Sequence, residues 1–348
     1  MKQKPYFSIV TPVYNREREI RQAIDSCLAQ DFADFEVIVV DGASNDNTAT
    51  VVSSYADPRV SLIRHACNRG VCPARNSAIR ASTGDWIIYL DSDHELLPGC
   101  LSRVFEVVSR DTDRIGRFGF MYDFDDGRVS PCPLPPDGIL GYEDWLRFSE
   151  RARWSDALWV TRRDTFDRCT MPESFGPEFR YNLDFSRNFT WRIVPEILAF
   201  QHTDSPVRLS FFRQTQDPEK EVRRELDWIE EWDGVLAEHG QALRELAPNR
   251  YQGTLRGKAV SYVLTGQQRR AMKASLECLV RYPGSLVNWM LLLATLFGKR
   301  ATRWARTVRA RRNSFARPED KTEHLRFSGL RAGQARTRTT EGPRACGI

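Results

Sequence analysis

The sequence lacks several patterns that mark common classes of protein. Its eight cysteines form no Cys-x-x-Cys pair and no zinc-ligand spacing, which argues against a zinc domain and a disulfide framework. We expect them to be reduced and mostly buried. No apolar run reaches the ~20 residues that a bilayer crossing needs. The opening Met1-Lys-Gln-Lys-Pro5 is not followed by the apolar stretch of a signal peptide, so we expect a cytoplasmic protein.

An excess of basic over acidic residues is confined to the C-terminal tail. The chain has 51 Lys and Arg against 46 Asp and Glu, a net charge of +5. Residues 299–348 contain 14 of the basic and four of the acidic residues, so the preceding 298 residues carry a net charge of −5. This part lacks the basic surface of a nucleic-acid-binding protein, and we expect no nucleic-acid partner. The tail has little apolar content, which is typical of a disordered segment.

Apolar runs in the first hundred residues are patterned as buried strands. One run begins at Phe7 and is expected to be broken by Pro12, a second covers residues 35–40, and a third covers residues 87–90. Helix-patterned segments between them predict parallel βαβ units, and hence an α/β fold. Ligands of such sheets bind at the carboxyl ends of the strands. The residues expected at that edge are Thr11, Tyr14, Asp41, Asp91 and Asp93.

The most informative segment is residues 87–95, where an apolar run ends in Asp91-Ser92-Asp93. Side chains two apart on an extended segment point the same way, so the two carboxylates should converge at the mouth of the sheet. Such a pair suits Mg²⁺ or Mn²⁺, which completes its coordination with substrate phosphates and water. A lone Asp-x-Asp tripeptide is more often a solvated turn, so the neighbouring motifs decide.

Four motifs occur in order at residues 11–15, 39–48, 68–76 and 84–93. They begin with Thr-Pro-Val-Tyr-Asn and end with Ile-Ile-Tyr-Leu-Asp-Ser-Asp, and together they resemble the family-2 inverting glycosyltransferases with the GT-A fold. The resemblance is firm over about residues 5–110 and looser to about residue 205. It implies a mainly parallel sheet flanked by helices. It also implies a Mn²⁺ or Mg²⁺ cofactor and a nucleoside-diphosphate sugar as donor, with UDP-sugars favoured.

The resemblance implies a donor site at the ends of these motifs. Its positions are Thr11, Pro12, Tyr14, Asp41, Arg75, Asp91 and Ser92. Tyr14 is expected to stack on the base, or is a core tyrosine. Asp41 accepts a hydrogen bond from the base edge, or is a turn or N-cap residue. Arg75 holds a phosphate, or forms a surface ion pair. Gly42 stands where many relatives carry a second aspartate, which leaves the base open.

The same resemblance implies the metal ligands. Asp91 approaches the ribose, and Asp93 binds the metal that bridges the phosphates and stabilises the leaving diphosphate. The third acidic position of many relatives is His94 here, a difference that we expect to weaken nothing essential but to change the local electric field. His202, at the end of the expected strand 191–202, is implied as a further ligand, although a lone histidine is more often structural.

The base that takes the proton of the acceptor hydroxyl is expected in residues 174–187, which resemble the acidic segment of the family. The alignment points to Asp184, and Glu178 is the second candidate. In the structural alternative, Asp184 only pairs with Arg187 at helical spacing. Asp156 lies in the acceptor-side half and is a further candidate for contact with substrate.

The length of the chain predicts more than one structural part. We expect a catalytic domain at residues 1–210, a helical appendage at 211–298 and a basic, disordered tail at 299–348. The apolar segment 286–297 is followed by seven Lys and Arg residues up to residue 312. This pattern fits a helix lying on an anionic surface, at the inner face of the cytoplasmic membrane. The alternative is an ordinary packed terminal helix.

We therefore expect a metal-dependent transferase that moves one sugar to a hydroxyl of a saccharide or lipid-linked acceptor, in surface polysaccharide or glycolipid biosynthesis. Polymerising relatives add membrane helices and a Gln-x-x-Arg-Trp motif, and both are absent. A dehydrogenase is disfavoured because no Gly-x-Gly-x-x-Gly follows the first strand, and a nucleotidyltransferase because no Gly-rich basic loop does. The alternative is a non-catalytic nucleotide-sugar-binding or membrane-docked scaffold, which needs Asp41 and Asp93 but not Asp184.

Overall fold

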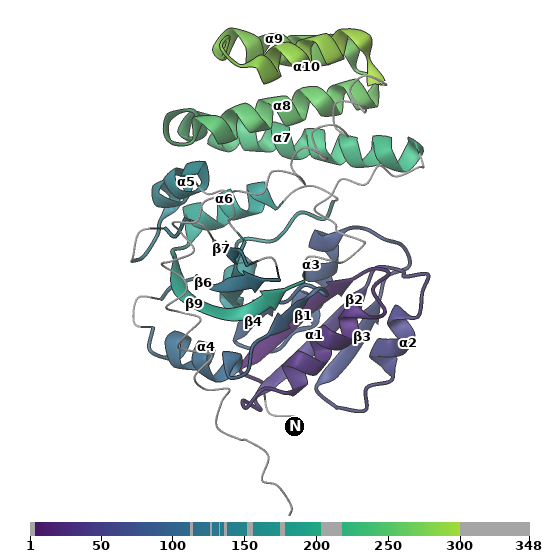
Figure 1. Cartoon of the computed structure of the whole chain (residues 1–348), viewed down its shortest axis with the longest axis vertical. Helices are drawn as coiled ribbons and strands as arrows, with labels where there is room; N and C mark the ends of the chain where they lie inside the picture. Colours follow the sequence, from purple (N-terminus) through teal and green to yellow (C-terminus); the bar gives the residue numbers. More distant parts are fainter. Residues whose placement is uncertain are drawn as a thin grey trace, which may run out of the picture. The chain divides into compact units, whose positions relative to one another are not determined.

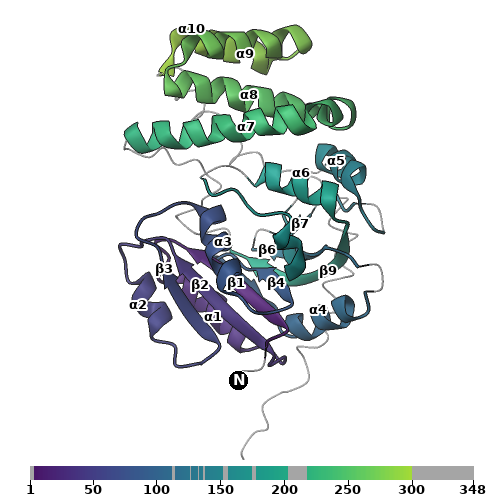
Figure 2. The same cartoon turned by 180° about the vertical axis from the view of Figure 1, so that it is seen from behind.

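A mixed sheet lies at the centre of the N-terminal part of the chain, as a computed structural model shows (Figures 1 and 2). Nine strands of it lie in the described residues. The structure describes residues 4–111, 114–125, 127–131, 133–135, 138–151, 156–174, 178–202 and 218–299. Except for Lys299, the predicted tail lies outside these residues. Of the cysteines that the structure describes, all are free and only Cys67 is exposed, as predicted.

The first four strands form the parallel half of the sheet, in the order β3-β2-β1-β4. They are β1 (Phe7–Val13), β2 (Phe35–Asp41), β3 (Val60–Arg64) and β4 (Trp86–Tyr89). The helices between them are α1 (Glu19–Leu28), α2 (Thr48–Ser53) and α3 (Val71–Ala81). Every residue of β1 and β4 is buried, as expected for parallel strands covered on both faces. The predicted βαβ organisation is confirmed.

Strand β1 runs through Pro12, where we had predicted a break. It pairs with β2 along its whole length, but with β4 only as far as Val10 and Tyr89. Beyond Val10, one side of β1 therefore has no neighbouring strand to hydrogen-bond. Pro12, which lacks a backbone N–H, is tolerated at such a position. Thr11 consequently lies inside the strand, 1% exposed, and not at its end.

The second half of the sheet continues in the order β8-β6-β9-β5, and β7 pairs with β6. Its strands are β5 (His94–Leu96), β6 (Arg117–Phe124), β7 (Val129–Ser130), β8 (Leu158–Arg162) and β9 (Trp191–Gln201). The helices here are α4 (Cys100–Ser109), the 3₁₀ helix Arg163–Asp167, α5 (Tyr142–Arg151) and α6 (Phe179–Asn188). Strand β6 runs parallel to β9, whereas β8 and β5 are antiparallel to their neighbours, so this half is mixed.

In the described part of the chain, further helices follow the sheet (Figure 1). They are α7 (Pro218–Leu246), α8 (Pro248–Thr265), α9 (Gln268–Arg281) and α10 (Leu286–Phe297). Helix α8 shows the usual punctuation, with Pro248 in its first turn and Gly266 in the left-handed conformation after its end. The apolar faces of α7 to α9 share one hydrophobic cluster with α5, α6 and β9. Among the described residues, no helix combines the length and apolar character needed to cross a membrane.

Candidate functional site

The carboxyl ends of β1, β2 and β4 carry the polar side chains of the candidate site. Asp41 ends β2, Arg16 follows β1, and Asp91 and Asp93 follow β4. Arg75, on α3, reaches the same edge and contacts Asp91. Three segments far apart in the sequence therefore meet at one edge, as the parallel arrangement predicts.

A tight turn brings Asp91 and Asp93 together. Strand β4 ends at Tyr89, and the N–H of His94 donates to the carbonyl oxygen of Asp91 at 2.9 Å. We had expected an extended segment here. The two residues are close as predicted, but a turn is the cause. Ser92, between them, is 5% exposed. The turn, and not the alternation of side chains along a strand, therefore brings the two carboxylates together at the sheet edge.

Arg75 joins Asp91 to Glu178. Its NH2 donates to Asp91 Oδ1 at 2.7 Å, and its NH1 donates to Glu178 Oε1 at 2.6 Å. The guanidinium is buried against the ring of Tyr89, so this ion pair is not the surface pair of our alternative. Burial alone would raise the pKa of the Asp91 carboxyl, but the charge of Arg75 outweighs it, and the pKa lies below its ordinary value. Asp91 is therefore ionised at neutral pH.

The residues present fit a divalent cation. Asp91, Asp93 and His94 each offer one ligand atom, and these atoms lie within 4.8 Å of one another. His94 Nδ1 is 3.1 Å from the hydroxyl of Tyr122. Its Nε2 is buried, lies 3.8 Å from Asp93 Oδ1, and has no hydrogen-bond partner in the described part of the chain. A buried nitrogen in this position suits a metal ligand, and two carboxylates with one imidazole suit Mn²⁺.

His202 lies directly after β9, and its ring faces Glu95. The distance from His202 Nε2 to Glu95 Oε1 is 2.5 Å, and the His202 N–H donates to the carbonyl oxygen of Asp93 at 3.1 Å. The antiparallel pairing of β5 with β9 brings this residue beside the turn. Its ring is not part of the three-residue group that could hold a metal, and its role as a ligand stays a prediction.

Asp41 organises the loop that follows β2. It is fully buried; its Oδ1 accepts from the Ser44 N–H at 3.0 Å, and its Oδ2 is 3.3 Å from Arg64 Nε. These contacts agree with the turn-residue alternative for Asp41, and binding of the base edge stays a prediction. Tyr14 is half-buried at the end of β1, on the same edge.

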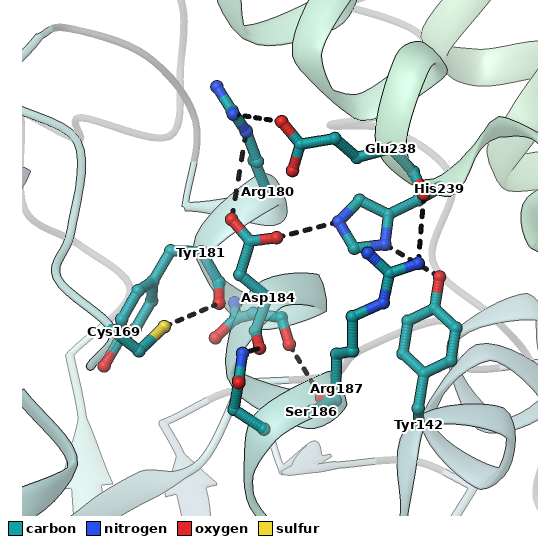
Figure 3. Close-up of polar contacts among 11 residues, drawn as sticks. Tyr142, Cys169, Arg180, Tyr181, Asp184, Ser186, Arg187, Glu238 and His239 are labelled. Atoms are coloured by element: carbon teal, nitrogen blue, oxygen red, sulfur yellow. Dashed lines mark hydrogen bonds and ion pairs between the residues drawn. The ribbon is translucent and has the colours of Figure 1, made fainter.

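Asp184 belongs to a second polar group, built from α5, α6 and α7 (Figure 3). His239 Nε2 is 2.9 Å from Asp184 Oδ1, and His239 Nδ1 is 2.7 Å from the Tyr142 hydroxyl. Because a carboxylate only accepts, a neutral His239 carries its proton on Nε2 and accepts from Tyr142 on Nδ1. The histidine is 1% exposed. Helix α7 therefore fixes one oxygen of the predicted base.

Arg180 and Glu238 complete this group (Figure 3). Arg180 NH2 donates to Glu238 Oε1 at 2.5 Å, and Arg180 Nε lies 3.8 Å from Asp184 Oδ2. Arg187 instead donates to the carbonyl oxygen of Glu238 at 3.2 Å. Our structural alternative for Asp184 is thus wrong in its partner, since the arginine at helical spacing is Arg180. Asp184, Glu238 and His239 also offer ligand atoms within 4.8 Å of one another, and the Arg180 guanidinium lies beside both carboxylates.

Comparison with known proteins agrees with this geometry. Residues 8–133 match the model of "Glycosyl transferase family 2". The most similar solved structures include S. aureus TarS 1-349 in complex with UDP-GlcNAc, with a TM-score of 0.54 and 15% identity over 80% of this chain and 92% of that one. The chain carries a family-2 glycosyltransferase domain with the GT-A fold.

Two bacterial proteins are among the curated relatives of this glycosyltransferase domain. The uncharacterized glycosyltransferase EpsJ of Bacillus subtilis is 28% identical over 61% of this chain and 57% of its own length. The Escherichia coli protein WfgD, a UDP-Glc:alpha-D-GlcNAc-diphosphoundecaprenol beta-1,3-glucosyltransferase, is 40% identical over 25% of this chain and 34% of its own length. The chain spans about half the length, or less, of the curated relatives it matches.

The structure adds residues that sequence reasoning missed or left without a role. His94 and Arg16 both contact Asp93, and His239 contacts Asp184. His94 and Arg16 carried a local signal, because each adjoins one of the motifs of the glycosyltransferase domain, whereas His239 carried none.

Asp156 has solvent-exposed surface. The surrounding protein nevertheless displaces water from around its carboxyl, and this desolvation raises the pKa of Asp156 to about 6. His94 opposes this shift, whereas Asp91 and Glu178 add to it. Asp156 is therefore within electrostatic reach of the donor edge, as a candidate for contact with substrate requires.

Proposed function

We propose that the protein is an inverting glycosyltransferase that moves a single sugar from a nucleoside-diphosphate sugar to a hydroxyl of a saccharide or lipid-linked acceptor. The observation that carries this proposal is the convergence of Asp41, Arg75, Asp91 and Asp93 at the carboxyl edge of the parallel strands of a family-2 domain. The activity of WfgD supports a lipid-diphosphate-linked acceptor and a role in surface polysaccharide or glycolipid biosynthesis. The UDP-GlcNAc complex of TarS supports a UDP-sugar donor.

In this proposal Tyr14 and Asp41 contact the base, and Arg75 holds the diphosphate. Thr11 and Pro12 lie in β1 before its end, and Ser92 lies between the two aspartates; contact of these three residues with the donor stays a prediction. Mn²⁺ or Mg²⁺ is held by Asp91 and Asp93, with His94 or the predicted His202 as a further ligand. A bound cation supplies a Lewis acid that neutralises charge on the leaving diphosphate. Arg75, on α3, adds a positive charge beside the leaving diphosphate, since its guanidinium lies 2.7 Å from Asp91 at the same edge.

Asp184 is the proposed base. His239 holds Oδ1, whereas Oδ2 lies 3.8 Å from Arg180, beyond hydrogen-bond distance, and one third of the Asp184 side chain is exposed. An oriented carboxylate with one accessible oxygen is what acceptance of a hydroxyl proton requires. Glu178, the second candidate, is bonded to Arg75 at 2.6 Å and belongs to the donor edge.

We also propose that α10 rests on an anionic membrane surface. Its buried residues are Asn288, Leu291 and Thr295. The opposite face is apolar and exposed, with Leu293 52% and Phe297 76% exposed. Basic residues follow it in the sequence. An apolar face with adjoining cations is typical of helices that lie in the interface of anionic bilayers. Such docking would bring the catalytic domain close to a lipid-linked acceptor.

The test is a thermal-shift screen of nucleoside diphosphates and their sugars, with Mn²⁺ and with EDTA, followed by product analysis with saccharide and lipid-linked acceptors. A ligand that binds only the folded state raises the free energy of unfolding of the protein, by ~2.7 kcal/mol when the ligand concentration is 100 times Kd. We expect one UDP-sugar to give the largest shift and to be consumed. Binding without turnover under any acceptor would favour the scaffold alternative. No shift with any nucleotide would contradict the proposal.

A further inference from the structure

Arg117, on β6, is a buried arginine that forms no ion pair within the described part of the chain. It is 3% exposed, and its hydrogen bonds go to neutral groups. Its Nε donates to Thr161 Oγ1 at 3.1 Å, and its two terminal nitrogens donate to Asn182 Oδ1 at 2.9 Å and to the Tyr181 hydroxyl at 2.8 Å. A guanidinium has five N–H groups, so these bonds leave two of them unused.

The charge of Arg117 is only partly compensated by its surroundings. The ring of Phe185 lies 3.9 Å from the guanidinium carbon and offers a favourable aromatic face, but it carries no negative charge. A buried charge without a counter-charge is unfavourable. An anion beside Arg117 would therefore stabilise the folded chain.

A small cavity lies beside Arg117, with room for about one molecule of the size of water. Trp145 on α5 and Trp191 on β9 also line it, and they are 5% and 3% exposed. Their rings pack edge to face, with centroids 4.3 Å apart. The indole N–H of each is buried and has no acceptor among the described residues. Buried donors without acceptors are rare in folded proteins, so this pair points to a bound group.

The polar groups at this cavity are mostly donors. The side-chain oxygen of Asn182 already accepts from Arg117, and the Ser186 hydroxyl donates to the carbonyl oxygen of Asn182 at 2.7 Å. A water molecule needs acceptors for its own two hydrogens, whereas a halide ion only accepts. The positive charge, the donors and the small volume together favour a monatomic anion.

We propose that this cavity binds a chloride ion, held by the guanidinium of Arg117 and by the indole N–H groups of Trp145 and Trp191. The ion joins β6 and β9 to α5 and α6, and α6 is the helix that carries Asp184. It is a structural ligand, since the cavity has no room for a sugar or a phosphate. The inference does not depend on the proposed function, because its test uses no substrate.

The test is thermal unfolding of the full chain in chloride, with methanesulfonate replacing chloride at constant ionic strength. Methanesulfonate is too large for the cavity. Because the unfolded chain has no such site, the unfolding midpoint should rise by about 2–4 °C when the chloride concentration reaches about ten times Kd. Crystals soaked in bromide should show anomalous scattering beside Arg117 and the two indoles.

Single substitutions remove one donor and keep an aromatic ring. Trp145→Phe and Trp191→Phe should each raise the Kd for chloride about tenfold or more, because each loses a hydrogen bond to a charged group. Trp86→Phe is the matched control, since Trp86 is also buried, at 6% exposure, but does not line the cavity. It should keep the wild-type dependence on chloride. Arg117→Gln should lose this dependence.

The outcomes decide between the ion and a water molecule. A midpoint that does not depend on chloride, or a dependence that both tryptophan variants keep, would reject the chloride site. Bromide that binds elsewhere but not in the cavity would do the same. Should Arg117→Gln not fold, the two tryptophan variants decide. A chain that binds chloride but transfers no sugar would contradict the proposed function and leave this site in place.

Discussion

The bond between His239 and Asp184 gives a direct test of the proposed base. Two variants separate chemistry from structure. Asp184→Asn keeps the volume, and its amide oxygen can still accept from His239 Nε2. His239→Phe keeps a ring in the buried position but removes the bonds to both Asp184 and Tyr142. The first change removes the base and spares the fold, whereas the second removes the support of the base.

The expected magnitudes follow from these contacts. His239→Phe removes one hydrogen bond to a charged group, worth ~1.5–3 kcal/mol, and one neutral bond, worth ~0.5–1.5 kcal/mol. Because Asp184 is one third exposed and Tyr142 is half-buried, water replaces part of this loss. We expect a decrease of about 2 kcal/mol in the free energy of unfolding. Asp184→Asn should lower this free energy by under ~1 kcal/mol but lower turnover by about 10²-fold or more.

The assays are urea unfolding, UDP-sugar affinity and kcat with a defined acceptor. Donor affinity should stay near the wild-type value in Asp184→Asn, because the residue lies in a different contact group from Arg75 and Asp91. Glu178→Gln is the control, and it should affect donor affinity more than the chemical step. If Glu178→Gln lowers kcat more than Asp184→Asn at equal donor affinity, the base is misassigned. If Asp184→Asn keeps wild-type kcat, Asp184 is structural.

Three further predictions concern the metal, the pH dependence and the membrane. Asp93→Asn should abolish turnover and metal-dependent donor binding while the protein stays folded, and near-normal activity in saturating Mn²⁺ would reject the assignment. Because the pKa of Asp156 is raised to about 6, above the ~3.9 of an unfolded aspartate, the folded chain retains a proton that the unfolded chain releases. The contribution of Asp156 to stability should thus fall as the pH rises from about 4 to 6, and urea unfolding should show this fall in the wild type but not in Asp156→Asn. Replacing the exposed Leu293 and Phe297 with glutamate should abolish flotation with anionic vesicles but spare activity on a short soluble acceptor, and equal flotation would make α10 an ordinary packed helix.

The parallel half of the fold was predictable because its signals are local. Strands β1, β2 and β4 are short apolar runs buried on both faces, and helical segments of ordinary length separate them. Position at a strand end then placed Asp41, Asp91 and Asp93 on one edge. The turn after β4 was not predicted, since a four-residue turn and a continued strand both bring side chains two apart into proximity.

The contacts that were missed are long-range. His239 is 97 residues from Tyr142 and 55 from Asp184, and Arg16, after β1, meets a carboxylate in the turn after β4. No periodicity of a single helix or strand contains such pairs, because they depend on how whole elements pack. The three-residue strand β5 is similar, since its partner β9 lies about a hundred residues later.

The donor edge and the group around Asp184 are built from different parts of the chain. The donor edge is built within residues 8–133, the part that matches the family model, apart from Glu178. The group around Asp184 is built from α5, α6 and α7, all outside that match. If Asp184 meets the acceptor, acceptor recognition depends on a helix that also belongs to the C-terminal hydrophobic cluster. Substitutions in α7 near His239 should then change acceptor KM and kcat while leaving donor affinity unchanged, a separation that a purely structural helix would not produce.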